Sequence, residues 1–277
     1  MIVFPIAKIN LGLNIVERRP DGYHNLQTVF YPVPIQDALE ISLMDEAFPS
    51  TSSCSLKVVN ATIDCNDDDN LVVRAYNLLK ADFPNMPRIY AHLWKGIPSQ
   101  AGMGGGSSDC AFMIRLLNKQ FDLGLTDKRM MNYAARLGAD CAFFILSRPC
   151  YAEGIGERLT PIDLDLTGWK LCVVRPNIPV PTKEAFSHIR PHYPSVNCLD
   201  VVKRPVDEWR ELLFNDFEES VFTLHPEIGN IKQQLYDMGA TYAAMSGSGS
   251  AVFGLFKEKP GQFAQAFSDM FHYCCTL

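Results

Sequence analysis

A regular alternation of apolar and polar residues lies near the start of the chain. Between residues 8 and 15 the odd positions are apolar and the even positions are polar or glycine. Successive side chains of a strand point to opposite faces, so this pattern predicts a strand with one buried face. Lys8 and Asn10 share the polar face and can reach one site, although an ordinary solvated lysine is the simpler interpretation of Lys8. The apolar face consists of Ile9, Leu11, Leu13 and Ile15.

Other apolar patterns predict strands and helices along the rest of the chain. Short apolar stretches bounded by turn residues indicate strands, and apolar residues at helical spacing after a capping residue indicate helices. The chain is therefore expected to be mixed α and β. The predicted strands are 39–43, 56–59, 89–94, 169–175, 240–245 and 251–256, and the predicted helices begin after Asn70, after Thr126 and near Asn215.

A glycine-rich run at residues 98–108 opens directly into a segment of helical spacing. Its four glycines allow the backbone to take positive φ and to approach a bound group closely, and we expect Ser107 and Ser108 to cap the helix. The free N–H groups at a helix N-terminus form a ready site for phosphate; a flexible linker is the alternative. The run consists of Pro98, Ser99, Gln100, Ala101, Gly102, Met103, Gly104, Gly105, Gly106, Ser107 and Ser108.

This loop matches neither of the two common nucleotide-binding fingerprints. A Walker A loop ends in Gly-Lys-Ser/Thr, whereas Gly106 is followed directly by Ser107. A G-x-G-x-x-G register that starts at Gly102 meets Ser107 where the third glycine belongs. Asp109 adds negative charge to the first helical turn, which suits the helix dipole, but its side chain must point away from a bound phosphate.

Three further residues carry candidate chemistry. Asp140 precedes an apolar run, and a partly desolvated carboxylate usually has a partner or a task; a helix N-cap is an equally good interpretation. The Asp-Gly pair at 21–22 predicts a hairpin turn. After it, Tyr23 offers a stacking face and His24 offers a donor and an acceptor near neutral pH.

Composition narrows the class of protein. The chain has 277 residues and a formal net charge of −6, so it can bury large cores and has no basic footprint for nucleic acid or an anionic membrane. Its nine cysteines include no CxxC pair, which is typical of reduced thiols in the cytoplasm. No apolar run is long enough for a membrane span, and the first residues do not resemble a signal peptide. We therefore expect a soluble cytoplasmic protein.

Taken together, the motifs resemble the GHMP small-molecule kinases, which include galactokinase, homoserine kinase and mevalonate kinase. Their nucleotide loop reads Pro-x3-Gly-hydrophobic-Gly-small-Ser-Ser, and residues 98–108 match it with one extra glycine, departing only where Gln100-Ala101 replaces a family-typical glycine. The closer resemblance is to the kinases of cytidine diphosphate-linked methylerythritol. The motifs that carry it are Ala7–Asn10, Asp21–His24, Gly104–Ser108, Leu137–Asp140, Glu153–Glu157 and Ser246–Gly249.

The resemblance implies an α+β two-domain GHMP kinase fold. The N-terminal half, residues 1–160, would be the ATP-binding domain with a ribosomal-protein-S5-domain-2-like fold. The C-terminal half, residues 161–277, would be ferredoxin-like, and the active site would lie in the cleft between them. The change to a proline-rich composition after residue 175 also favours a boundary shortly before Trp169.

The resemblance also implies roles for individual residues. The reaction would be ATP-dependent phosphorylation of the 2-hydroxyl of the methylerythritol unit, with Mg²⁺ as cofactor and no protein ligand assigned to it. Lys8 and Asp140 would be the catalytic pair, with Asp140 accepting the hydroxyl proton. Tyr23 and Phe186 would sandwich the cytosine ring and His24 would contact its polar edge. Asn10 and Thr182 would lie near the substrate, and Lys95, Asn70 and residues 98–108 would line the ATP side.

Two alternatives remain open at this point. The first is another GHMP kinase of the mevalonate or homoserine type, which the Asp21–His24 motif and the triple glycine disfavour. The second is a nucleotide-binding protein without catalysis, which the presence of both Lys8 and Asp140 disfavours. We expect a monomer or a weak homodimer with a small-molecule substrate and no nucleic-acid or membrane partner.

Overall fold

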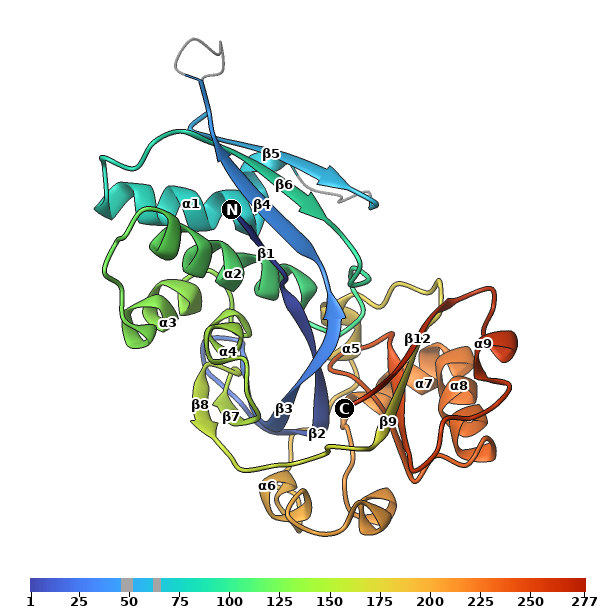
Figure 1. Ribbon diagram of the computed structural model, residues 1–277. Helices are drawn as coiled ribbons and strands as arrows, with labels where there is room; N and C mark the ends of the chain where they lie inside the picture. The colour runs from blue at the N-terminus through green and yellow to red at the C-terminus, as the bar shows by residue number, and fades with distance from the viewer. Residues whose placement is uncertain (46–51, 62–65) are drawn as a thin grey trace. The chain divides into compact units, whose positions relative to one another are not determined.

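The computed structural model describes residues 1–45, 52–61 and 66–277 (Figure 1). The chain divides into two compact units, and each unit is assembled from stretches that are far apart in the sequence. The boundary expected near residue 160 stays a prediction. The first unit comprises Met1–Ala7, Ile35–Ser99 and Gly104–Arg148; the second comprises Lys8–Pro34, Gln100–Met103 and Pro149–Leu277.

The first unit contains a four-stranded sheet in the order β1-β4-β6-β5, in which β5 runs parallel to β6 and the other pairs are antiparallel. Helices α1 and α2 lie side by side in this unit (Figure 1). Its elements are β1 (Ile2–Val3), β4 (Ala38–Leu43), β5 (Cys54–Val59), η1 (Asp67–Asp69), α1 (Leu71–Asp82), β6 (Ile89–Trp94), α2 (Gly105–Gln120), α3 (Asp127–Ala135) and α4 (Cys141–Leu146).

Capping residues define two of these helices as the sequence predicts. The side chain of Asn70 accepts a hydrogen bond of 2.9 Å from the backbone N–H of Val72 and so caps α1. The hydroxyl of Thr126 accepts one of 3.4 Å from the N–H of Arg129 at the start of α3. Each bond satisfies one of the N–H groups that a helix start leaves without an intrahelical partner.

The second unit contains two four-stranded sheets, in the orders β2-β3-β7-β8 and β10-β11-β9-β12. Strands β2 and β3 each also contribute residues to the first unit. The elements are β2 (Ile6–Arg18), β3 (His24–Gln36), β7 (Cys150–Gly154), β8 (Arg158–Pro161), β9 (Lys170–Arg175), α5 (Thr182–Ala185), α6 (Cys198–Val201), η2 (Val206–Glu211), α7 (Phe217–Leu224), α8 (Pro226–Asp237), β10 (Tyr242–Met245), β11 (Val252–Phe256), α9 (Phe263–Ala266) and β12 (Phe271–Thr276).

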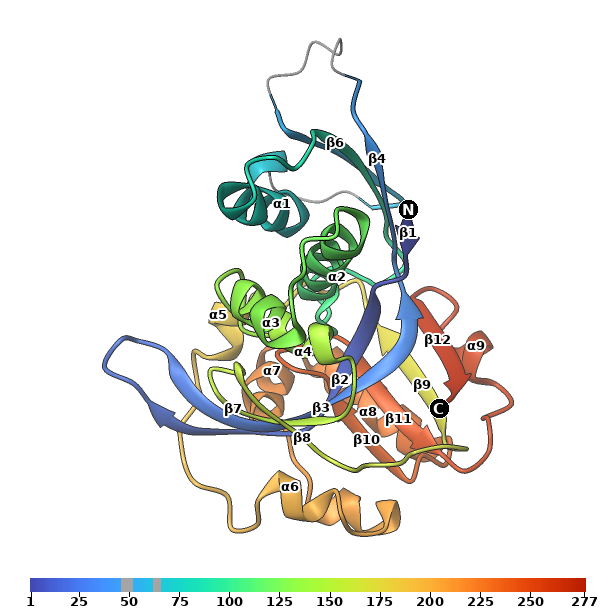
Figure 2. The same cartoon turned by 60° about the vertical axis from the view of Figure 1, so that its left-hand side comes forward.

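The core of the second unit lies between the β10-β11-β9-β12 sheet and helices α7 and α8, which Figures 1 and 2 both place next to it. Leu13 and Ile15 of β2 also belong to this core. Strands β9, β10 and β11 are where the apolar pattern predicts them, and β10 and β11 pair antiparallel, whereas no pattern predicted β12.

One expectation for β2 is wrong. The alternation predicts one buried face, but the structure buries both faces from Ala7 to Val16. Lys8, Asn10 and Asn14 expose only 3%, 2% and 7% of their surface. The polar face is therefore covered by other parts of the protein, and its side chains need polar partners there.

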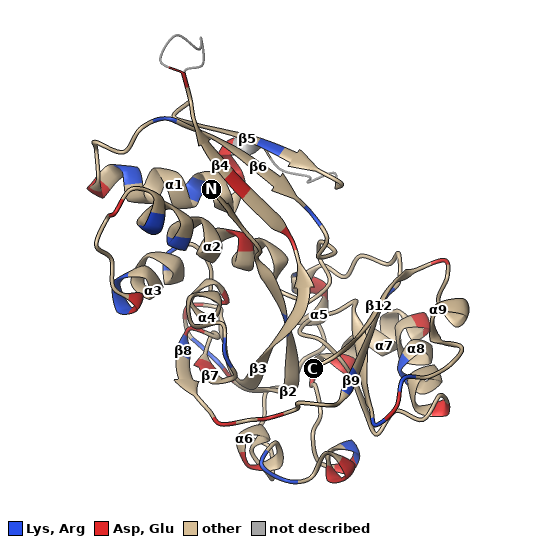
Figure 3. Ribbon diagram, in the orientation of Figure 1, with Lys and Arg blue, Asp and Glu red and all other residues tan. Residues whose placement is uncertain are grey.

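Basic and acidic residues are interspersed on helices of both units (Figure 3). Within the described ranges, no helix combines the length and the apolar character that a bilayer span needs. The eight cysteines outside the gaps are all free thiols.

Candidate active site

The first half of the glycine-rich loop packs within the second unit. The backbone N–H of Lys8 donates to the carbonyl oxygen of Met103 over 3.1 Å, and the N–H of Ala251 donates to that of Ala101 over 3.3 Å. Gly102 has a φ of +70°, and a Cβ there would lie 1.8 Å from the carbonyl oxygen of Ser246. Glycine is thus required at position 102 for both conformation and close approach.

The departure from the family pattern at Gln100-Ala101 has a conformational cost. Gln100 has a φ of +51°, a left-handed conformation that glycine adopts much more readily than a residue with a side chain. The chain therefore keeps the loop geometry at a position where it lacks the favourable residue. Pro98 and Ser99, which precede it, belong to the first unit.

The second half of the loop starts helix α2 in the first unit. Gly104, with a φ of +71°, is the N-cap, and the helix begins at Gly105. The expectation that Ser107 and Ser108 cap this helix is wrong, because both lie inside its first turn and the N–H of Ser108 already donates to the carbonyl of Gly104 over 2.8 Å. The earlier N–H groups of the turn remain available to an anion, as in any helix start.

The segment that carries Asp140 lies next to this helix start. Asp140 occupies the N-cap position of α4 and is half-buried. In the preceding turn, a Cβ on Gly138 would lie 3.0 Å from the Sγ of Cys141 and 3.9 Å from the Oγ of Ser107. The first unit thus brings the carboxylate segment and the first turn of α2 together, although they are separated by more than thirty positions in the chain.

Lys8 is held in a polar cluster of the second unit. Its Nζ donates to the Oδ1 of Asn10 over 2.6 Å and lies 5.0 Å from the ring centroid of Phe30. The Nδ2 of Asn10 donates to the Oγ1 of Thr28 over 2.9 Å, and the Thr28 hydroxyl donates to the carbonyl of Gly12 over 2.5 Å. These contacts fix the orientation of the Lys8 ammonium on β2.

Lys95 has a different environment from the one expected. Its Nζ forms ion pairs with Asp37 and, over 2.7 Å, with the Oδ2 of Asp109. Asp37 is also held by the backbone N–H groups of Gly96 and Ile97 at 2.7 and 2.8 Å. The ammonium of Lys95 is directed into the interior between two carboxylates, and the prediction that Lys95 lines the ATP side stays a prediction.

The same ion pairs account for Asp109. This side chain is 3% exposed and points into the unit toward Lys95, as the loop required. Burial raises the pKa of Asp109 to about 8, with the ammonium of Lys95 opposing the shift and Asp37 adding to it. Burial lowers the pKa of Lys95, but the carboxylates of Asp109 and Asp37 offset this, and its pKa is raised. Lys95, Asp37 and Asp109 together carry little net charge. Asp109 therefore adds little negative charge to the first turn of α2.

Aromatic residues form a stack in the second unit. The ring of His24 lies on that of Phe186 with 4.7 Å between centroids and 19° between planes, and Phe186 meets Phe217 edge-on at 4.8 Å. Tyr23 is 61% exposed. Burial, and then the charge of Arg18, lower the pKa of His24 below its usual range, so its ring is neutral at pH 7 and offers one donor and one acceptor.

The remaining predicted residues fall beside these groups. Thr182 is the first residue of α5, close in sequence to Phe186. Asn70 caps α1, and its neighbour Leu71 would be 3.9 Å from a Cβ on Gly106 in α2. Sequence reasoning missed Asp37 and Thr28, since an isolated acid and an isolated hydroxyl carry no local signal of a distant buried lysine or asparagine.

Comparison with known proteins identifies the family of the chain. The GHMP kinases N terminal domain family matches residues 70–148, and the GHMP kinases C terminal family matches residues 200–272. A 4-diphosphocytidyl-2-C-methyl-D-erythritol kinase of Bacteroides fragilis is 54% identical over 92% of both chains. The enzyme of that name from Bacteroides thetaiotaomicron is 55% identical over 93% of this chain and 92% of its own.

Solved structures agree on the fold. A crystal structure of 4-(cytidine 5'-diphospho)-2C-methyl-D-erythritol kinase matches 99% of this chain and 98% of its own at a TM-score of 0.82 and 29% identity. The mevalonate kinase of Methanococcus jannaschii matches at a TM-score of 0.73 over 100% of this chain and 98% of its own, with 14% identity, which shows a shared fold. The chain therefore belongs to the 4-diphosphocytidyl-2-C-methyl-D-erythritol kinase family of the GHMP kinases.

Proposed function

We propose that the chain transfers the γ-phosphoryl group of ATP to the 2-hydroxyl of 4-diphosphocytidyl-2-C-methyl-D-erythritol, a step of non-mevalonate isoprenoid precursor synthesis. The observation that carries this proposal is the proximity, within the first unit, of the Asp140 segment to the glycine-led start of α2. A phosphate-binding helix start beside a half-buried carboxylate is the minimum that a kinase of an alcohol requires.

The nucleotide would be held mainly by backbone. The N–H groups of Gly105, Gly106 and Ser107, at the first turn of α2, would bind the β- and γ-phosphates together with the helix dipole. Asn70, Pro98 and the other residues of the run would line the ATP side. The ammonium of Lys95 would support α2 from the interior instead of contacting the nucleotide.

Mg²⁺ fits the groups around this helix start. No cluster of three or more acidic, histidine or cysteine side chains suited to a metal exists in residues 1–45, 52–61 or 66–277. That agrees with an ion held largely by phosphates and water. The hydroxyl of Ser107 and the carboxylate of Asp140 are the hard oxygen donors best placed to contribute. Bound with ATP, the ion would neutralise phosphate charge that N–H groups cannot.

Asp140 would accept the proton of the 2-hydroxyl. A carboxylate is a weak base for an alcohol, so the proton moves late and Asp140 chiefly orients the nucleophile toward the γ-phosphorus. Lys8, oriented by Asn10, would stabilise the charge that develops on the transferred group. Both residues act on a loose, in-line transition state in which positioning and charge stabilisation supply most of the catalysis.

The cytidine end would bind at the aromatic stack. Tyr23 and Phe186 would sandwich the cytosine ring, with Thr182 nearby, while Asn10 would lie near the methylerythritol end. His24 covers a face of Phe186, so a cytosine on that face requires His24 to move to the edge of the base. A neutral His24 can there donate to one cytosine atom and accept from another.

Turnover on three alcohols tests this function. The purified protein is incubated with ATP and Mg²⁺ and, separately, with the cytidylyl substrate, mevalonate and homoserine, and product is measured by mass spectrometry. We expect phosphorylation of the cytidylyl substrate with a kcat/KM far above the other two. Preference for mevalonate or homoserine would replace the substrate assignment, and no turnover on any of them would favour a non-catalytic nucleotide-binding protein.

Localisation and assembly follow as lesser proposals. Free thiols at the eight described cysteines suit a reducing cytoplasm. All residues assigned to the site come from one chain, so we propose that a monomer is active and that any homodimer is weak.

A further inference from the structure

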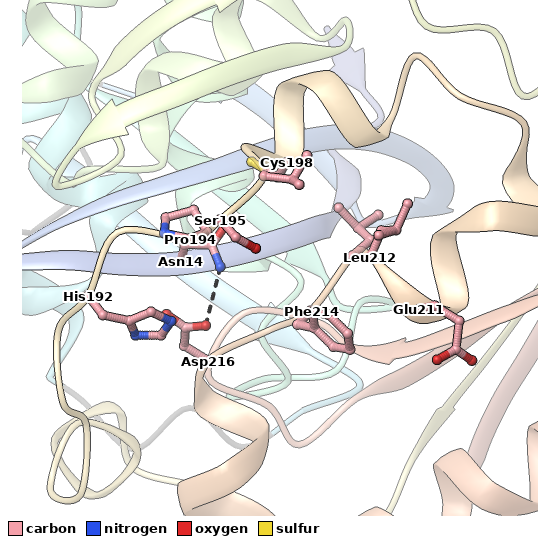
Figure 4. Close-up of a pocket in the computed structure, with 11 residues that line it drawn as sticks. Asn14, His192, Pro194, Ser195, Cys198, Glu211, Leu212, Phe214 and Asp216 are labelled. Carbon is pink, nitrogen blue, oxygen red and sulfur yellow. Dashed lines mark hydrogen bonds between the residues drawn. The ribbon is translucent and has the colours of Figure 1, made fainter.

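Asn215 and Asp216, expected from the sequence to start a helix, precede α7 and join two parts of the second unit. The backbone bridges β2 at Leu13, with hydrogen bonds of 2.9 Å from Leu13 N–H to Phe214 and 2.8 Å from Asp216 N–H to Leu13. The carboxylate of Asp216 accepts from the N–H of Ile15 over 2.7 Å. It also accepts from the Nδ2 of Asn14 over 3.2 Å, as Figure 4 shows. These residues are therefore fixed to the strand that carries Lys8.

Asn215 uses both N–H donors of its side-chain amide. It is 3% exposed, and its Nδ2 donates to the carbonyl oxygens of Met245 and Gly247, each over 2.8 Å. Its Oδ1 accepts from the N–H of Phe217 over 3.0 Å. An asparagine amide offers two N–H donors, and both are directed at the end of β10 and the loop that follows it.

That loop, residues 246–250, contacts the glycine-rich run. The Ser246 hydroxyl donates to the carbonyl of Gly102 over 2.9 Å. Gly247 has a φ of +55°, and a Cβ on it would lie 3.2 Å from the Gly102 carbonyl oxygen and 3.3 Å from the Oδ1 of Asn10. The Oδ1 of Asn10 is the atom that receives the Lys8 ammonium.

A continuous set of contacts thus runs from Asn215 through Gly247 to Gly102 on one side and to Asn10 on the other. The carbonyl oxygen of Met103, next to Gly102, accepts a hydrogen bond from the backbone N–H of Lys8. Displacement of the 246–250 loop would therefore disturb the phosphate loop and the amide that orients Lys8 at the same time. Displacements of about 1 Å can lower the rate of an enzymatic step by about 10²-fold.

We propose that Asn215 is a positioning residue for phosphoryl transfer, which holds the 246–250 loop against Gly102 and Asn10. The proposal rests on the proposed kinase function. Asn215 itself touches neither reacting group; it acts through two carbonyl oxygens whose position it fixes. Loss of its two donors should therefore affect ATP and the chemical step more than the cytidine end, because an aspartate at position 215 keeps the oxygen that accepts from Phe217, whose ring packs against Phe186 of the aromatic stack.

The test substitutes Asn215→Asp, which keeps the size of the side chain and removes both donors. A carboxylate oxygen would then face the carbonyls of Met245 and Gly247. We expect kcat to fall by about 10- to 100-fold and KM for ATP to rise, with KM for the cytidylyl substrate unchanged.

Asn197→Asp is the matched control. The Asn197 side chain has the same pattern of bonds, donating to Gln27 and Tyr151 over 3.2 and 3.0 Å and accepting from the N–H of Leu199 over 2.8 Å. None of these hydrogen bonds involves residues 98–108 or residues 246–250. We expect Asn197→Asp to lower the melting temperature comparably and to leave both KM for ATP and kcat near the wild-type values.

If Asn215→Asp and Asn197→Asp change the kinetics equally, or if Asn215→Asp changes only stability, Asn215 is structural and the proposal is overturned. If Asn215→Asp fails to fold, Ser246→Ala is the second test, because it removes the hydrogen bond from the 246–250 loop to Gly102. This variant must also raise KM for ATP. An unchanged KM overturns the proposal. An inactive wild type would instead refute the proposed function, so the two failures are distinguishable.

Discussion

Lys8 and Lys95 are almost equally buried, with 3% and 5% of their surface exposed, but their ammonium groups meet different chemistry. Lys95 forms ion pairs with the carboxylates of Asp37 and Asp109 inside its own unit. Lys8 donates to the neutral amide of Asn10 and lies over the ring of Phe30. Asn10 and Phe30 orient the Lys8 ammonium. We propose that Lys95 supports the fold of the first unit and that Lys8 acts in the reaction.

Lys95→Met gives the largest expected effect on stability. It leaves the carboxylate of Asp37 and the carboxyl group of Asp109 buried without their shared cation, and breaking a buried ion pair in this way costs about 3–5 kcal/mol. Urea denaturation should show a loss of that order, while the variant that remains folded keeps KM for ATP within the experimental error. A large rise in KM for ATP at nearly normal stability would instead return Lys95 to the nucleotide site.

Lys8→Met should produce the opposite pattern. Loss of a preorganised charge at a developing negative group costs about 10²–10³-fold in kcat, and stability should fall less than in Lys95→Met because Asn10 keeps its bond to Thr28. Steady-state kinetics and urea denaturation of the two variants, measured side by side, check this contrast. If Lys8→Met were as destabilising as Lys95→Met and fully active, the distinction between the two lysines would be wrong.

Tyr23→Ala serves as a reference for the two lysine variants, because the Tyr23 side chain is neither buried nor charged. Stacking of a base on an aromatic ring contributes about 1–3 kcal/mol, so KM for the cytidylyl substrate should rise while kcat and the free energy of unfolding change little. An unchanged KM would remove Tyr23, which is 61% exposed, from the substrate site.

The pH dependence of stability tests the charge state around Lys95. Burial raises the pKa of Asp109 from 3.8 to about 8, so between these values the folded protein retains a proton that the unfolded chain has lost. Stability therefore falls as pH rises through this window, by at most about 1.4 kcal/mol per unit for one proton. Denaturation at several pH values should show a flatter profile for Asp109→Asn than for the wild type; parallel profiles would exclude Asp109 as the titrating group.

Much of this fold could be predicted from local patterns. The positions of strands β2, β10 and β11 and the caps at Asn70 and Thr126 depend on neighbouring residues, and the structure has them as expected. The burial of the polar face of β2 could not be predicted in the same way. It depends on contacts such as that of Thr28 with Asn10, and a polar residue shows no local sign of what covers it.

The conformation and contacts of residues 98–108 and 246–250 could not be predicted from the sequence either. Helix spacing and the two serines predicted a cap at Ser107 or Ser108. In the structure, Gly104 has a positive φ and is the N-cap, so α2 begins at Gly105. A glycine permits such a conformation without requiring it, so the sequence could not place the start. The bond between Asn215 and Gly247 joins residues 32 positions apart, and no local pattern indicates such a pair.

We propose that Asp140 orients the alcohol for transfer from ATP bound at the start of α2. A single-turnover measurement of Asp140→Asn with saturating ATP and the cytidylyl substrate tests it most directly, together with ATP affinity by calorimetry. We expect the transfer rate to fall by about 10²–10⁴-fold while ATP binds as in the wild type. Transfer at nearly the wild-type rate would contradict the role of Asp140.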